Sequence, residues 1–210
     1  MQRNVSLDIM KGIGMLAVIL GHTFTIPTYP YRNALFSFHM PLFFILAGYF
    51  YKKDDDVKGR VKKDFRRLII PYIFTASILL VYDMVKAIYY HDADCCVTGI
   101  VRVFISSGSF HSSLYFWDVP IVGPLWFLLA LFWCKTGYNY LVVKTHHANC
   151  LVIGIAIAAT LLDRYLINLP FGFLPGLSAM VFFWVGAFPP TANLSANVVF
   201  SCPTTLEQLC

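Results

Sequence analysis

Three ionisable side chains lie in the first apolar stretch of the 210-residue chain, and they are Asp8, Lys11 and His22. Lys11 and His22 are eleven residues apart, which on a helix returns them to nearly the same face and separates them by about 16 Å. Asp8 precedes Lys11 by three residues, where a carboxylate can pair with the ammonium. Such a polar stripe in an apolar helix indicates a functional path. Side chains that reach out to the two membrane interfaces would explain it equally well.

A second histidine follows closely. His39 lies in the run FSFHMPLFF, about one turn inside the second apolar stretch, and a short connection joins this stretch to the first. The two imidazoles are therefore expected in the same half of a helical bundle. A lone histidine on an apolar helix is more often a packing residue. A pair of histidines, however, can accept a proton from a hydroxyl at neutral pH, so the pattern predicts proton transfer at a buried acceptor.

The composition indicates that lipid surrounds the elements that position these residues. The chain is 58% hydrophobic and 13% charged, with a mean hydropathy of +0.66, whereas soluble domains are about a quarter charged. Its apolar residues fall in blocks near the length of about 20 residues that crosses a bilayer core. Backbone groups in lipid must bond within their own segment, so these blocks are expected to be helices.

The predicted fold class is therefore all-α, a polytopic transmembrane helical bundle of about six spans. The predicted spans cover residues 6–25, 34–51, 68–88, 121–142, 149–163 and 172–188. The six cysteines follow no regular spacing, so neither a disulfide framework nor a metal site is expected.

The orientation follows from a basic connection at residues 52–67, which contains eight lysines and arginines. Short basic loops stay on the cytoplasmic side. This places both termini in the cytoplasm and the segment 89–120 outside, in a multi-pass protein of the inner or plasma membrane. The formal net charge of +5 then reflects topology and contact with anionic lipid. No basic face with interleaved aromatic residues exists elsewhere, so nucleic acid is not an expected partner.

Four motifs in this order resemble those of the acyltransferase-3 family. Residues 7–22 are similar to its first-helix motif, a basic residue, ten others and a histidine. Residues 39–49 (HMPLFFILAGY) resemble the second-helix motif, with Ala47 where serine is common. Residues 66–72 (RRLIIPY) resemble the basic entry to the family's third helix. Residues 123–128 (GPLWFL) resemble a motif that comes later in the family's sequences. Within the class, the chain most resembles the fucose 4-O-acetylase-like branch.

This resemblance implies a membrane O-acyltransferase that uses cytoplasmic acetyl-CoA, or another acyl-CoA, as donor. The acceptor would be a hydroxyl of an exported or cell-surface carbohydrate or glycolipid. His22 is expected to be the general base, and His39 to orient it or relay protons. Lys11 would hold a phosphate or the thioester end of the donor. Direct transfer and a covalent acyl-histidine both remain compatible with these residues.

The remaining candidates are assigned weaker roles. Arg67 is expected at the donor site, and Asp8, Arg66 and Trp126 are accessory candidates. For the two arginines, a role that only marks the inner membrane boundary is as compatible as donor binding.

The resemblance also shows a departure, because family members usually carry about ten spans. We therefore expect a partial acyltransferase-3 domain at residues 1–188 and an unstructured polar tail at residues 189–210. A truncated chain of this kind is expected to insert in the membrane with little activity of its own. Two alternatives follow, an inactive fragment and a transporter or scaffold in which Asp8, Lys11 and His22 line a solute path. The sequence indicates no oligomeric state.

Overall fold

The computed structural model describes residues 5–23, 30–91, 94–105, 113–114, 117–118, 123–145, 147–165 and 169–187. This part of the chain is helical, as predicted, apart from a two-residue antiparallel pair, β1 (Ser113–Leu114) with β2 (Trp117–Asp118). The α-helices are α1 (Val5–Thr23), α2 (Pro30–Tyr49), α3 (Val57–Asp64), α4 (Ile70–Tyr90), α5 (Asp94–Ile105), α6 (Trp126–Lys144), α7 (Ala148–Tyr165), α8 (Phe173–Ser178) and α9 (Met180–Ala187). A short 3₁₀ turn, η2 (Gly123–Leu125), precedes α6.

Each predicted span coincides with a helix, but the structure differs from the sequence expectation in three details. The basic connection is not a plain loop, because its second half forms α3. The segment between residues 89 and 120, which the sequence predicts to lie outside, contains a further helix, α5. The last predicted span is not continuous, since α8 ends at Ser178 and α9 begins at Met180. The predicted tail, residues 189–210, lies outside the described residues.

One helix of the described residues is long and apolar enough to cross a membrane, Val57–Tyr90, while shorter apolar helices occur at Ala34–Tyr49, Ala148–Asp163 and Phe173–Ala187. The long helix consists of α3, the π-helical turn η1 (Phe65–Ile69) and α4. Only 17% of its most apolar window is buried, whereas the central helix of a soluble protein would be mostly covered. Large apolar side chains on α4, such as Phe74 and Ile88, are 68% and 72% exposed.

Pro71 explains the π-helical turn. Proline has no backbone N–H and its ring clashes with the carbonyl four residues earlier, which here belongs to Arg67. The chain widens by one residue at this point, and the Ile70 N–H donates to the Phe65 carbonyl five residues back. The basic α3 and the apolar α4 thus remain one helix, with Arg67 at the junction.

The core lies where α2, α6, α7 and α9 meet, around Phe44, Cys134, Val152 and Phe183. The contact between α2 and α9 is made backbone to backbone. A β-carbon added to Gly48 would collide with the Phe183 carbonyl, and one added to Gly186 with the Ile45 carbonyl. Small residues at such positions allow helices to approach closely in a membrane.

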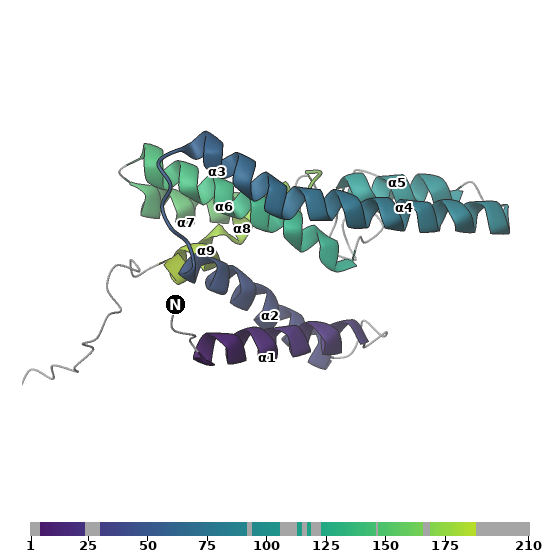
Figure 1. Cartoon of the computed structure of the whole chain (residues 1–210), viewed down its shortest axis with the longest axis horizontal. Coiled ribbons are helices and arrows are strands. Elements are labelled where there is room, and N and C mark those ends of the chain that lie inside the picture. Colours follow the sequence, from purple (N-terminus) through teal and green to yellow (C-terminus); the bar gives the residue numbers. More distant parts are fainter. Residues whose placement is uncertain are drawn as a thin grey trace, which may run out of the picture.

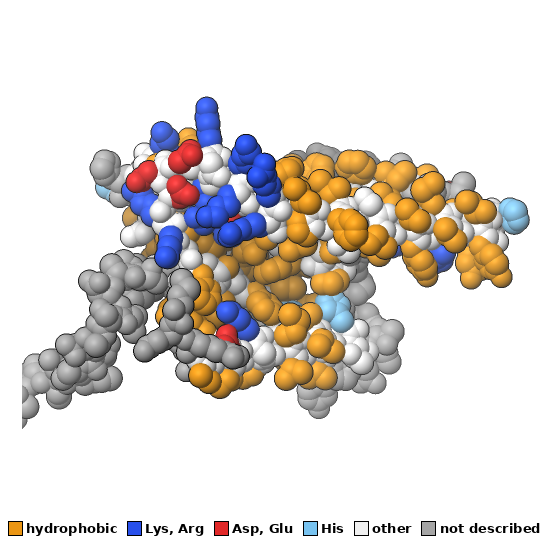
Figure 2. Space-filling model, in the orientation of Figure 1, with side chains coloured by type: hydrophobic (Ala, Val, Ile, Leu, Met, Phe, Trp, Pro, Cys, Tyr) orange, Lys and Arg blue, Asp and Glu red, His pale blue; other side chains and the backbone are white. Residues whose placement is uncertain are grey.

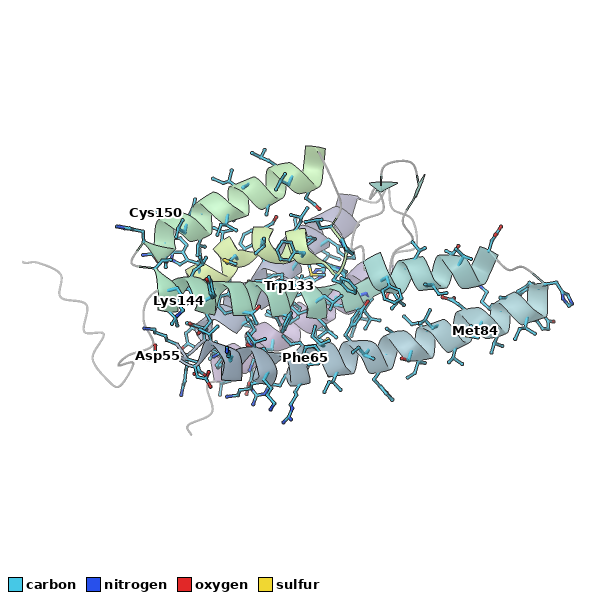
Figure 3. All side chains as sticks on the ribbon, turned by 90° about the horizontal axis from the view of Figure 1, so that it is seen from above. Asp55, Phe65, Met84, Trp133, Lys144 and Cys150 are labelled. Atoms are coloured by element: carbon cyan, nitrogen blue, oxygen red, sulfur yellow. The ribbon has the colours of Figure 1, made fainter. Side chains whose placement is uncertain are left out.

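Figure 1 shows α1 and α2 on one side of the molecule, facing a second layer that contains α3, α4 and α6. The pair α4 and α5 extends beyond this layer as an arm. Across the arm, Arg102 Nη1 lies 3.4 Å from Asp83 Oδ2. In Figure 3, Asp55, Lys144 and Cys150 lie toward one end of the molecule, and Met84 lies toward the other. The connection that holds Asp55 and the end of α6 that holds Lys144 therefore share one end.

Candidate active site

A polar cavity of about 360 Å³ lies between the last turn of α2, α3 and the middle of α6. We call it the basic pocket. It is lined by Ala47, Phe50, Tyr51, Lys52, Arg60, Lys63, Asp64, Arg67, Leu131 and Lys135. Five of these side chains are cationic and one is acidic, so the lining has a net formal charge of +4. In Figure 2, lysines and arginines gather over α3, and apolar side chains cover the arm.

Helical spacing brings four charged residues of this pocket to one face. Lys63 and Asp64 lie three and four residues after Arg60, and Arg67 lies four and three residues after them, which places all four on one side of a helix. The Asp56 carboxylate caps the helix by accepting the Gly59 N–H at 3.0 Å. The sequence expectation that Arg67 reaches a site is consistent with this arrangement, whereas Arg66 does not line the pocket.

A buried ion-pair triad forms the inner wall of the basic pocket. Asp64 Oδ2 accepts from Arg60 Nε at 2.8 Å, and Asp64 Oδ1 accepts from Lys135 Nζ at 2.7 Å. Arg60 Nη1 also donates to the Lys52 carbonyl at 2.9 Å. The Asp64 side chain is 2% exposed, so one carboxylate holds two cations from different helices in fixed positions. The triad retains one positive charge.

A second network holds the loop beside the pocket. Asn139 of α6 is fully buried, and its Oδ1 accepts from the Tyr51 hydroxyl at 2.6 Å and from the Asp54 N–H at 3.2 Å. Its Nδ2 donates to the Asp54 carbonyl at 2.9 Å. The Arg60 guanidinium in turn lies over the Tyr51 ring, with its Cζ atom 5.3 Å from the centre of the ring. The Asn139 amide thus holds both Tyr51 and Asp54 in place. The Tyr51 ring then contacts Arg60.

Lys11 lies beside this pocket. Its Nζ is 4.7 Å from the centre of the Phe50 ring, which lines the pocket. Asp8 Oδ1 is 3.9 Å from the same ammonium, at the predicted spacing. Of the two residues expected to bind the donor, Arg67 of η1 lines the pocket, whereas Lys11 of α1 reaches it only through its contact with Phe50.

The two candidate histidines meet around one phenyl ring, and we call His22, Phe36 and His39 the histidine cluster. The His22 and Phe36 rings are 5.2 Å apart in an edge contact, and the Phe36 and His39 rings are 5.0 Å apart. The glycine at position 21 makes this approach possible, because a β-carbon there would come within 3.0 Å of the Phe36 ring. The expectation that both histidines occupy one region of the bundle is consistent with this geometry.

His39 has a defined hydrogen-bonding state. It is completely buried, and its Nδ1 lies 2.6 Å from the Leu35 carbonyl one turn earlier. A carbonyl can only accept, so Nδ1 is the donor, and whenever the ring is neutral Nε2 carries the lone pair. Nε2 has no hydrogen-bond partner within the described residues. His22 is exposed on the last turn of α1.

The cluster and the basic pocket lie along the same pair of helices. His39 of α2 and Phe50, the residue that follows the end of α2, are eleven residues apart, as Lys11 and His22 are on α1. Each spacing corresponds to a rise of about 16 Å on nearly one helix face. A ligand whose one end is bound in the pocket therefore needs an extended chain of about that length to reach the imidazoles.

Trp126 lies elsewhere, in an apolar groove of about 590 Å³ between α2, α6, α7 and α9 that also includes Met40, Pro41 and Phe182. Met40 and Pro41, the two of these residues that belong to α2, are turned away from the helix face that carries His39. The structure does not bring Trp126 together with the other predicted site residues.

Sequence reasoning missed Lys135 and Asn139, the two α6 residues that organise the basic pocket. Lys135 interrupts an apolar helix and is 17% exposed at its side chain. The rule that identified Asp8 and Lys11, an ionisable residue inside an apolar span, would also have found Lys135. Its partner Asp64 lies 71 residues earlier in the chain, and no spacing rule connects such distant positions.

The sequence matches a family described as an acyltransferase domain over residues 4–188. Nodulation protein NolL of Sinorhizobium fredii (strain NBRC 101917 / NGR234) is 25% identical over 147 residues, which cover 61% of this chain and 34% of NolL. The aligned part thus spans about a third of the length of this curated relative. No solved structure matches the chain.

Proposed function

Because this chain belongs to the acyltransferase-3 family, we propose that it transfers an acyl group from acyl-CoA to a carbohydrate hydroxyl. The observation that carries the proposal is the basic pocket, whose lining has a net charge of +4. Two histidines lie about 16 Å away along the same pair of helices. The carbohydrate acceptor, and acetyl as the acyl group, follow from the resemblance to the fucose 4-O-acetylase-like branch.

The pocket suits the charged end of coenzyme A. Phosphate oxygens bind well to lysine and arginine through charge-assisted hydrogen bonds. Lys52, Lys63 and Arg67 each line the pocket with no hydrogen bond or ion pair from their side chains to other described residues. Lys11, next to Phe50, would add a further charge near the point where the donor leaves the pocket.

The length of the donor supports the same placement. The pantetheine arm between the diphosphate and the sulfur contains about 13 covalent bonds, which at the reach of an extended chain is about 15 Å. The pocket and the histidine cluster are separated by about 16 Å along α2. Phosphates in the pocket would therefore bring the thioester to His22 and His39.

In the proposed reaction, His22 accepts the proton of the acceptor hydroxyl while the oxygen attacks the thioester carbonyl carbon. The C–S bond then breaks, and the coenzyme A sulfur takes the proton as a thiol. His39, whose Nδ1–H is bonded to the Leu35 carbonyl, would present Nε2 as a second proton acceptor. General-base assistance of this kind contributes typically 10²- to 10⁴-fold to the rate.

We further propose that the helices cross the inner or plasma membrane about six times, with both ends in the cytoplasm. Exposed apolar side chains along α4 support lipid contact. The long helix measures about 51 Å at 1.5 Å per residue, more than the roughly 30 Å of a hydrocarbon core. Its basic N-terminal end, α3, would project into the cytoplasm, where acyl-CoA is available.

The test uses the 210-residue protein in lipid nanodiscs with radiolabelled acetyl-CoA and a mixture of sugar acceptors. Transfer is expected to be weak, because the chain matches only about a third of its curated relative, and His22→Ala and Lys11→Ala should each remove it, while membrane insertion is unchanged. Lys11→Arg should retain more activity because it keeps the charge, although its planar fork differs in geometry. Near-normal transfer by His22→Ala would rule out His22 as the base. Failure of the wild-type protein to bind acetyl-CoA would rule out the donor site.

A further inference from the structure

We infer that the basic pocket recognises a third phosphate group, so that it selects coenzyme A over its 3′-dephospho form, and that Lys135 is a residue that makes this selection. This inference rests on the proposed acyl-CoA donor and adds the chemical feature by which the donor is chosen. None of the four family motifs contains Lys135. The inference depends on the buried triad of Arg60, Asp64 and Lys135.

The triad contains an unbalanced buried charge. Arg60 and Lys135 have side chains that are 10% and 17% exposed, and they share the single carboxylate of Asp64. Removing a charge from water is costly unless an opposite charge compensates it. Two cations with one anion leave one positive charge uncompensated at the wall of a cavity. An anion bound in that cavity would compensate it.

The triad also keeps donors available for such an anion. A lysine ammonium has three N–H donors, and Asp64 is the one hydrogen-bond partner of Lys135 Nζ within the described residues. Its remaining donors have no protein acceptor in that part of the chain. Because the ion pair fixes the ammonium before a ligand arrives, little side-chain freedom would be lost on binding.

The total charge indicates how many phosphates fit. The pocket lining has a net charge of +4, and each phosphate monoester carries about −1.5 to −2 at neutral pH. A diphosphate alone, at about −2, would leave the lining strongly positive. A diphosphate together with a 3′-phosphate approximately balances it. A cavity of about 360 Å³ is within the usual range for small-molecule sites, about 300 to 1,000 Å³.

Phosphates on anionic lipid headgroups share this chemistry, and the two sources are separable by experiment. The purified 210-residue protein is placed in nanodiscs of neutral lipid or of 30% phosphatidylglycerol, roughly the composition of an anionic membrane surface. Binding of coenzyme A and 3′-dephospho-coenzyme A is then measured by equilibrium dialysis. We expect coenzyme A to bind at least tenfold more tightly, in both kinds of nanodisc.

The decisive variant is Lys135→Met, which keeps an unbranched side chain and removes the charge. We expect it to weaken coenzyme A binding at least tenfold and to bring the two ligands within about twofold of each other. Lys63→Met, at an exposed pocket position with no acid partner, gives a second measurement if Lys135→Met does not fold. It should weaken coenzyme A binding severalfold. Lys62→Met removes the same charge from α3 outside the pocket, and should change neither affinity.

Each result separates the two proposals. Equal affinity of the wild-type protein for the two ligands would overturn the inference and leave the acyl-CoA donor intact. Binding of neither ligand would overturn both. Loss of coenzyme A binding in phosphatidylglycerol nanodiscs alone would identify the pocket as a lipid headgroup site and overturn the inference. If Lys135→Met retained the selectivity for coenzyme A, and Lys63→Met also left the affinity for coenzyme A unchanged, the pocket would not be the site that recognises the 3′-phosphate.

Discussion

Lys135 Nζ and Asp64 Oδ1 lie 2.7 Å apart, and this contact joins the middle of α6 to the last residue of α3. Asp64 is in turn bonded to Arg60 one turn earlier. A single acidic side chain therefore fixes two helices and two cations at the wall of the basic pocket. Its removal should affect both the stability of the bundle and the shape of the pocket.

Asp64→Ala is expected to lower the free energy of unfolding by about 3 kcal/mol, because breaking a buried pair leaves uncompensated buried charge. Thermal unfolding in detergent measures the change. The control is Asp55→Ala, which breaks an exposed pair with Lys53 at 3.2 Å and should cost less than about 1 kcal/mol. Equal effects of the two substitutions would mean that the triad does not stabilise the bundle.

His22→Ala and His39→Ala are each expected to lower kcat for acetyl transfer by about 10²- to 10⁴-fold, because each removes an imidazole from the proposed proton path. Single-turnover transfer of labelled acetyl groups provides the measurement. His147→Ala, an exposed histidine outside the cluster, should leave kcat unchanged. If only His22→Ala lowers kcat, His39 is a packing residue and has no part in the chemistry.

Gly186→Ala is expected to destabilise the bundle by several kcal/mol, because its β-carbon would meet the Ile45 carbonyl of α2 and force the two helices apart. Gly154→Ala is the matched control, since a β-carbon there meets no atom within 4 Å. That substitution should be neutral or stabilise α7 by up to about 1 kcal/mol. Unfolding temperatures in detergent compare the two variants. Similar losses in both would show that α2 and α9 are not in backbone contact.

Asn139→Leu should cost about 3 kcal/mol of stability, because it leaves the Tyr51 hydroxyl and both backbone groups of Asp54 without their buried partner. The donor KM should also rise, since Tyr51 lines the pocket. Tyr51→Phe removes one of the three hydrogen bonds and should cost about 1 kcal/mol. Steady-state kinetics and thermal unfolding test both effects. An unchanged KM in Asn139→Leu would separate the loop from donor binding.

The proposed orientation is tested on the long helix itself. In a cysteine-free background, Lys58→Cys should react with a membrane-impermeant maleimide only from the cytoplasmic side. Tyr89→Cys, 76% exposed at the other end of the helix, should react only from outside. Labelling of position 58 from outside would reverse the orientation, and labelling of both positions from one side would exclude a span.

Much of the helical architecture follows from the sequence, because long apolar blocks have few alternatives to a helix. The exceptions have local causes. The short helix α3 has a low apolar content and depends on its Asp56 cap, so hydropathy does not detect it. The break after α8 falls at Ala179, a residue type that favours helices, so helix propensity does not predict it.

For the candidate site, the sequence identified residues that lie near each other within one helix or across a short loop. Asp8 with Lys11, and His22 with His39, are of this kind. The basic pocket also requires α3 to pack against α6, a contact between distant parts of the chain that no motif records. The tautomer of His39 likewise depends on the Leu35 carbonyl, which the histidine pattern alone does not reveal.

The glycine contact between α2 and α9 has a consequence for the order of synthesis. The face of α2 around Gly48 packs against α9, which is synthesised roughly 140 residues later. At 5 to 20 residues per second, this interval is about 7 to 28 s. During that time the helix that carries His39 must be shielded by lipid, by α1 or by the insertion machinery. The histidine cluster, made from neighbouring helices, can therefore form early, whereas the face of α2 around Gly48 is covered only after α9 has been made.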